Sequence, residues 1–159
     1  MKKYITLFLG LITFSSAFAD LNNINNFNRK IEAIKIAEKA CFAASTSEGS
    51  TQSCYSDMYI SAEKLLNEFY KDRVQTLKQD IKSEKSLPLS QKVSHVILDR
   101  LNRAQESWSK SSNADCSLES AQMLNGNGEG KIYVRCLSVK TLQRVEYLVK
   151  QVRLESDWF

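Results

Sequence analysis

The chain has very little proline, glycine and histidine for its length. Its 159 residues include one proline, five glycines and one histidine, His95, and no long apolar run follows residue 14. Because proline and glycine interrupt regular structure, their scarcity favours long helices joined by few turns. A membrane helix needs about 20 apolar residues in succession, so no later segment is predicted to span a bilayer.

A marked excess of one charge is also absent. The 22 lysines and arginines oppose 18 acids, a formal charge of +4, and the two signs alternate along the chain. Residues 1–19 carry two lysines and no acid, so their removal leaves +2. Nucleic-acid-binding proteins usually carry a basic stripe or a markedly basic domain. We therefore expect no nucleic-acid partner.

Residues 1–19 have the features of a secretory signal peptide. Two lysines precede an apolar run from Tyr4 to Phe14, and the segment ends in Ala-Phe-Ala at Ala19. This order predicts cleavage before Asp20. No cysteine stands at that point to take a lipid, so we expect a soluble, exported protein, periplasmic or secreted. Residues 20–159 are long enough for a single domain with one core.

Four cysteines follow the predicted cleavage point: Cys41, Cys54, Cys116 and Cys136. An even number in an exported chain indicates two disulfides. Of the three possible pairings we expect Cys41 with Cys54 and Cys116 with Cys136, because each closes a short loop between predicted helices. There is no C-x-x-C pair and only one histidine, so neither a metal site nor a cofactor is expected.

Apolar residues recur every three or four positions over four segments, which predicts amphipathic helices. These helices span about Phe27–Cys41, Cys54–Ser83, Ser90–Trp108 and Tyr133–Arg153. The asparagine-rich stretch before Phe27 is expected to be loose. The predicted inner face of the third helix comprises Val93, Ile97, Leu101, Ala104 and Trp108. The predicted fold is all-α, a small helical bundle of about four helices with two disulfides.

Two segments between these helices are rich in turn-forming residues. Ser45–Ser53 contains Gly49 and is predicted to be a break in the helical pattern. Ser109–Lys131 loses apolar periodicity and holds three of the five glycines, so it is predicted to contain a flexible loop. The second cysteine pair would brace that loop.

Residue patterns that support catalysis are scarce. No G-x-S-x-G element accompanies His95, and no glycine loop has the strand-to-helix context that cradles phosphate. Spacing singles out no pair among the carboxylates that a wall hydrolase would need. The acids considered are Glu63, Glu68, Asp115, Glu119 and Glu129. We expect a protein that is not an enzyme.

Several spacings together resemble a known family. They are L-N-x-x-Y at Leu66, Asn67 and Tyr70, A-Q-x-x-W at Gln105 and Trp108, and C-x4-T-x-x-R at Cys136, Thr141 and Arg144. Cys116 also stands eight residues after the tryptophan. Over roughly Lys39–Val149 the chain resembles the lysozyme-inhibitor LprI N-terminal-like family. The resemblance implies a small helical, disulfide-bearing domain of the cell envelope, in a family whose named member inhibits lysozyme.

The same residues allow two interpretations. Leu66 and Trp108 lie on apolar helical faces, where such residues are usually core. The polar residues beside those faces can form a hydrogen-bonded network that orients the helices, which we favour, or they can form a ligand site.

As an inhibitor, the chain is expected to insert the braced loop Ser117–Lys131 into the enzyme's cleft, because a pre-ordered loop loses less entropy on binding. The expected contact residues are Ser117, Asn125, Asn127, Glu129, Lys131 and Arg135. Lys131 and Arg135 would meet the enzyme's catalytic acids, with added contacts around Ser47–Ser53. The alternative is an envelope interaction or immunity protein that binds another cell-wall-active enzyme or toxin.

Overall fold

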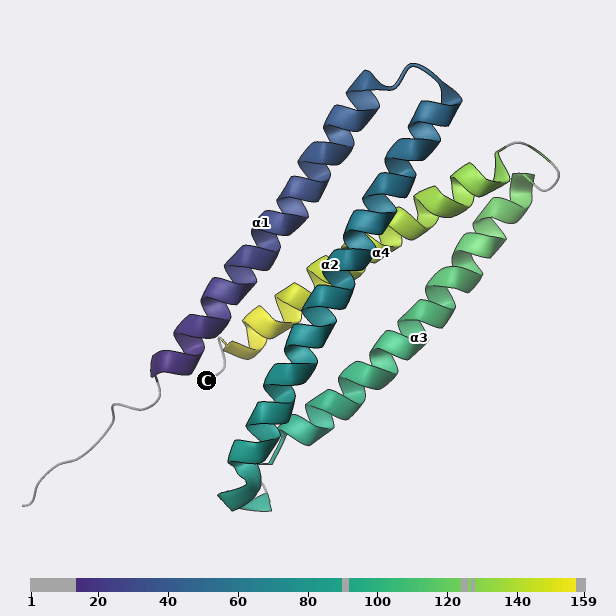
Figure 1. The fold of residues 1–159 in the computed structure, drawn as a ribbon. Coiled ribbons are helices and arrows are strands. Elements are labelled where there is room, and N and C mark those ends of the chain that lie inside the picture. The colour runs from purple at the N-terminus through teal and green to yellow at the C-terminus, as the bar shows by residue number, and fades with distance from the viewer. Residues whose placement is uncertain (1–13, 90–91, 124–125, 127, 157–159) are drawn as a thin grey trace, which may run out of the picture.

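Four long helices run alternately up and down in a computed structural model (Figure 1). The structure describes residues 14–89, 92–123, 126 and 128–156, and side chains from residue 22 to residue 154 within these ranges. The helices are α1 (Phe14–Ala44), α2 (Glu48–Ser83), α3 (Ser94–Ser120) and α4 (Glu129–Ser156). Two short 3-10 turns, η1 (Glu84–Ser86) and η3 (Ala121–Met123), follow α2 and α3. Every element in the described ranges is helical, which confirms the all-α prediction.

Three connections join the four helices, and they are divided between the two ends of the bundle. The α1–α2 and α3–α4 turns lie at one end, and the α2–α3 connection lies at the other (Figure 1). Helices α2 and α4 pack against each other most extensively, while α1 and α3 each pack against both of them. The bundle therefore consists of two hairpins joined across the far end.

One main core lies between α1, α2 and α4. Phe27 of α1 meets Phe69 of α2 edge to face, with ring centroids 5.0 Å apart. The buried core residues are Ile24, Phe27, Ile31, Met58, Ala62, Leu65, Leu66, Phe69, Leu142, Val145, Leu148 and Val149. Leu101 and Trp108 of α3 pack on its edge while remaining partly exposed. Apolar burial at this interface is the main force that fixes the positions of the helices.

The asparagine-rich stretch was predicted to be loose, and this prediction is wrong. Residues 22–27 belong to α1, where Ile24 and Phe27 are buried in the core and Asn22, Asn25 and Asn28 are exposed. Asparagine is a weak helix former, but two buried apolar residues three positions apart outweigh that preference.

The predicted loop between Ser109 and Lys131 is also much shorter than expected. Helix α3 continues to Ser120 and α4 begins at Glu129, so only residues 121–128 connect them. Along the extended part of α3 the buried positions are Ser112, Cys116 and Ser120. These small residues recur every four positions and allow α3 to approach α4 closely. They carry too little apolar character to produce a hydrophobic pattern in the sequence.

Smaller corrections concern helix boundaries and faces. The break at Ser45–Ser53 is confined to residues 45–47, because α2 begins at Glu48. Ser90, the predicted start of the third helix, lies outside the described residues, and α3 begins at Ser94. Val93 and Ala104 were expected to face inward, but both are exposed.

Candidate functional site

The residues of the three sequence elements lie on three helices. Leu66, Asn67 and Tyr70 are on α2, Gln105 and Trp108 on α3, and Thr141 and Arg144 on α4. A cavity of about 180 Å³ between these helices is lined by five of the seven, namely Leu66, Asn67, Gln105, Trp108 and Thr141. Residues up to 75 positions apart in the chain are thus brought together.

Two hydrogen bonds join helices within this cluster. Arg144 Nε donates to Gln105 Oε1 at 3.1 Å and joins α4 to α3. Tyr70 Oη donates to Asn102 Oδ1 at 2.5 Å and joins α2 to α3, beside the cavity rather than in it. These hydrogen bonds therefore connect α3 to α4 and α2. They supplement the apolar contacts of α3, which come from the partly buried Leu101 and Trp108.

Arg144 is held mainly by aromatic rings. Its guanidinium carbon lies 5.6 Å from the ring centroids of both Trp108 and Tyr147. Burial lowers the pKa of the guanidinium below its usual value, and the phenol of Tyr147 opposes this shift. Arg144 Nη2 is buried and makes no hydrogen bond to the described residues. Contact with two rings compensates for the lack of an acidic partner in this part of the chain.

Tyr59 of α2 also lines the cavity of about 180 Å³. Its hydroxyl donates to Glu63 Oε1 at 3.1 Å, and burial, aided by that carboxylate, raises the pKa of the phenol. Tyr59 also packs on the Cys116–Cys136 disulfide cluster, so the cavity adjoins the bond that joins α3 to α4.

Both disulfides lie near the same end of the bundle. Cys41 pairs with Cys54 across the α1–α2 turn, with Cα atoms 5.7 Å apart, and Cys116 pairs with Cys136 across the α3–α4 turn, with Cα atoms 5.5 Å apart. This confirms the expected sequential pairing. We call residues 41–54 and 116–136 the stapled end.

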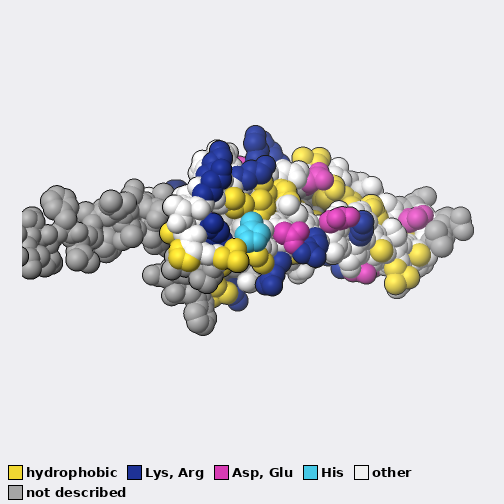
Figure 2. Space-filling model, turned by 90° about the horizontal axis from the view of Figure 1, so that it is seen from below, with side chains coloured by type: hydrophobic (Ala, Val, Ile, Leu, Met, Phe, Trp, Pro, Cys, Tyr) yellow, Lys and Arg dark blue, Asp and Glu magenta, His cyan; other side chains and the backbone are white. Residues whose placement is uncertain are grey.

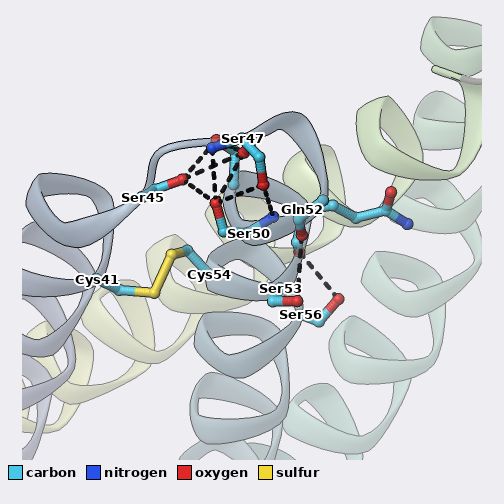
Figure 3. Close-up of a disulfide and its surroundings, with 10 residues drawn as sticks. Cys41, Ser45, Ser47, Ser50, Gln52, Ser53, Cys54 and Ser56 are labelled. Atoms are coloured by element: carbon cyan, nitrogen blue, oxygen red, sulfur yellow. Dashed lines mark hydrogen bonds between the residues drawn. A yellow bond between two sulfur atoms is a disulfide. The ribbon is translucent and has the colours of Figure 1, made fainter.

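Serine hydroxyls order the α1–α2 turn. Ser47 and Ser50 form a reciprocal capping box at the start of α2, and Ser45 Oγ lies 2.8 Å from both Ser50 Oγ and Thr51 Oγ1. Figure 3 shows these side chains above the Cys41–Cys54 bond. The cap satisfies amide groups that the helix leaves unpaired, so the turn is fixed by both hydrogen bonds and a covalent link.

The expected contact residues occupy the stapled end in part. Ser117 is exposed on α3, Glu129 and Lys131 lie in the first turn of α4, and Arg135 lies one turn later. Asn125 and Asn127 lie outside the described residues.

The two cations of this set already have acidic partners. Lys131 Nζ pairs with Glu48 at the start of α2, and Arg135 Nη2 lies 2.8 Å from Glu119 Oε1 on α3. The first pair joins one turn to the other. Gly130 is also close to α2, because a Cβ at that glycine would lie 3.7 Å from Gln52 Nε2. The two turns therefore form one continuous surface.

The family model of the lysozyme inhibitor LprI matches residues 41–148, most of the chain. The protein belongs to the LprI family. No curated protein and no solved structure gives a significant match.

The region matched by the LprI model begins at the first disulfide cysteine and ends at a core residue of α4. It includes both disulfides and all seven residues of the sequence elements. It omits most of α1, although α1 contributes Phe27 and Ile31 to the core. In this chain the LprI region therefore packs against a helix that lies largely outside the match.

Sequence reasoning missed one exposed apolar residue at the stapled end. Leu118 is 74% exposed and lines a shallow depression of about 580 Å³ with Asp115, Glu119, Ala121 and Gln122. Its exposure follows from the helical register, because residues 116 and 120 face inward and residue 118 lies between them. A helical reading of this segment would have revealed it.

The described part of the chain contains neither a metal-binding cluster nor a helix suited to span a membrane. In residues 14–89, 92–123, 126 and 128–156, no three His, Cys, Asp or Glu side chains are grouped to hold a metal ion. Within the same ranges no helix combines the length and hydropathy of a bilayer span.

Proposed function

We propose that the protein is an exported, non-catalytic binding protein that inhibits a lysozyme or a related wall-active enzyme. The observation that carries the proposal is the LprI match over residues 41–148. Two disulfides support an oxidising compartment, in agreement with the signal peptide predicted at residues 1–19. The residues of that segment from 1 to 13 lie outside the described structure.

The stapled end is the surface we assign to the enzyme. A disulfide closes each of its two turns, and the Lys131–Glu48 ion pair joins one turn to the other. A surface held in one conformation loses little entropy when it binds, which favours affinity. It exposes Ser117 and Leu118, and burial of an exposed leucine in an interface favours binding because apolar surface is removed from water.

Existing ion pairs limit what the basic residues contribute. Lys131 and Arg135 can meet an acid of the enzyme only by leaving Glu48 and Glu119, so their net gain in binding energy is small. We therefore assign the larger share of affinity to Leu118 and less to the cations.

The test measures the rate at which a panel of lysozymes lyses peptidoglycan-bearing cells. The assay is run with and without the disulfide-bonded protein, purified after export. Leu118→Ser is expected to weaken inhibition of a sensitive enzyme about tenfold, the value of burying one leucine. Leu89→Ser, at the opposite end, is the matched control and is expected to leave inhibition unchanged.

No inhibition of any enzyme in the panel by the folded protein would overturn the proposal. The alternative would then be favoured, an interaction or immunity protein that binds another wall-active enzyme or a toxin in the envelope.

A further inference from the structure

The end opposite the disulfides has a distinct charge. We call residues 71–89 and 92–103, which comprise the end of α2, the described part of the α2–α3 connection and the start of α3, the α2–α3 tip. It carries eight lysines and arginines against four acids, a net of +4 within a chain whose total is also +4. The positive charge of the protein is therefore concentrated there.

The acids of the tip are engaged in contacts of their own. Glu84 accepts hydrogen bonds from the Ser94 amide and hydroxyl, and Asp99 pairs with Arg103. Asp72 accepts a hydrogen bond from Asn23 Nδ2 at 2.6 Å. Asp72 and Glu84 thus accept hydrogen bonds from neutral groups, and Asp99 pairs with an arginine.

Most cations of the tip lack an acidic partner in the described part of the chain. They are Lys71, Lys78, Lys82, Lys85 and Arg100. Lys71, Lys78 and Lys82 line one shallow groove of about 610 Å³ along α2. At the stapled end, by contrast, Lys131 and Arg135 are both paired.

Exposed aliphatic residues accompany these cations. Leu89 is 83% exposed, and Leu87, Val93 and Val96 are also exposed. Figure 2 looks at the molecule from this end and shows apolar and basic side chains side by side around the histidine. The leucines flank Pro88 in a connection that projects from the bundle (Figure 1).

We propose that the α2–α3 tip docks on an anionic phospholipid surface. Unpaired lysines beside exposed leucines match the two requirements of peripheral membrane binding, attraction to phosphates and burial of apolar side chains at the acyl boundary. Leu87 and Leu89 enter the interface, and Lys78, Lys82 and Lys85 contact the headgroups. Exposed leucines on a projecting connection can insert into a deformable lipid surface without a preformed pocket on the other side.

This docking sets the orientation of the molecule. Helix α2 has 36 residues and a length of about 54 Å, so the stapled end is held about 50 Å from the lipid. The inference does not depend on lysozyme inhibition, because the two surfaces lie at opposite ends.

The test is co-sedimentation of the oxidised, exported protein with vesicles of phosphatidylglycerol and phosphatidylcholine, compared with vesicles of phosphatidylcholine alone. We expect binding to the anionic vesicles only. The double variant Lys78→Glu/Lys82→Glu is expected to reduce the binding constant at least about tenfold, and Leu89→Ser about tenfold.

Two controls match these variants. Lys39→Glu/Lys64→Glu changes the net charge by the same amount at exposed lysines outside the tip, and Leu118→Ser removes an exposed leucine at the stapled end. Both are expected to bind vesicles within about twofold of the wild type.

Three results would overturn the proposal. They are failure of the wild type to bind anionic vesicles, equal losses in tip and control variants, and binding that requires the lysines but is unaffected by Leu89→Ser. The last result, together with binding to soluble polyglutamate, would assign the tip to an acidic polymer instead.

Discussion

At one end of the bundle two disulfides fasten the turns, whereas at the other end α2 and α3 are joined by a chain segment held through hydrogen bonds from Ser94 to Glu84. The stapled end has paired cations and a fixed surface. The α2–α3 tip has unpaired cations and exposed leucines. The comparison shows that one fold combines an end braced by two disulfides with a basic, apolar end that has no disulfide.

The largest effect is expected from removing both disulfides. Each closes a loop of 13 or 20 residues and contributes about 3 kcal/mol, so the total is comparable to the stability of a small domain. We expect the protein to be largely unfolded in reductant, as measured by urea denaturation followed by circular dichroism. An unchanged midpoint, once the thiols are shown to be free, would contradict this.

The next largest loss of stability is expected from a substitution that creates a cavity in the α2–α3 tip. Leu77 is 1% exposed, so Leu77→Ala should lower the free energy of unfolding by about 3 kcal/mol. Amide hydrogen exchange should accelerate more at residues 84–96 than at residues 112–120, where a disulfide persists. Ile60→Ala, at an exposed position of α2, is the control. Equal acceleration at both ends would show that they open as one unit.

Removing the Glu84 side chain is expected to lower the free energy of unfolding by a smaller amount. Glu84→Ala removes the acceptor of the Ser94 hydrogen bonds and should cost about 1 kcal/mol. Glu84→Gln retains one acceptor oxygen and should recover part of the loss. Urea denaturation measures both variants. If the two lose the same stability, the cap does not act through its acceptor oxygen.

The smallest effect is expected at the ion pair that joins the two turns. Glu48 is highly exposed, so Glu48→Gln should change the free energy of unfolding by less than about 0.5 kcal/mol. The melting temperature provides the measurement. A loss above about 1 kcal/mol would mean that this pair organises the stapled end in addition to the disulfides.

The sequence was sufficient to predict the helical class and the cysteine pairing. Periodic apolar residues identified α2 and most of α4, because their inner faces bear large side chains such as Leu66 and Leu148. The sequential pairing followed from the short separations between cysteines. Both signals are local, so they do not require knowledge of the tertiary structure.

The end of α3 and the start of α1 were missed for opposite reasons. At the end of α3 the buried residues are small, and packing against α4 with a disulfide replaces a hydrophobic stripe. At the start of α1 the asparagines masked the helical signal of Ile24 and Phe27. These two residues stabilise the helix there because they pack into the core formed with α2 and α4. The error at α3 also hid Leu118, so an error in secondary structure became an error in the predicted surface.

Each disulfide joins two cysteines that are consecutive in the chain. A polypeptide that enters an oxidising compartment from its N-terminus presents Cys41 and Cys54 before Cys116 emerges. An oxidant that joins thiols in order of arrival thus forms the native bonds directly, and no thiol exchange is needed to correct them. The first hairpin can thus be locked before the cysteines of the second reach the compartment, and this order of pairing does not require an isomerase.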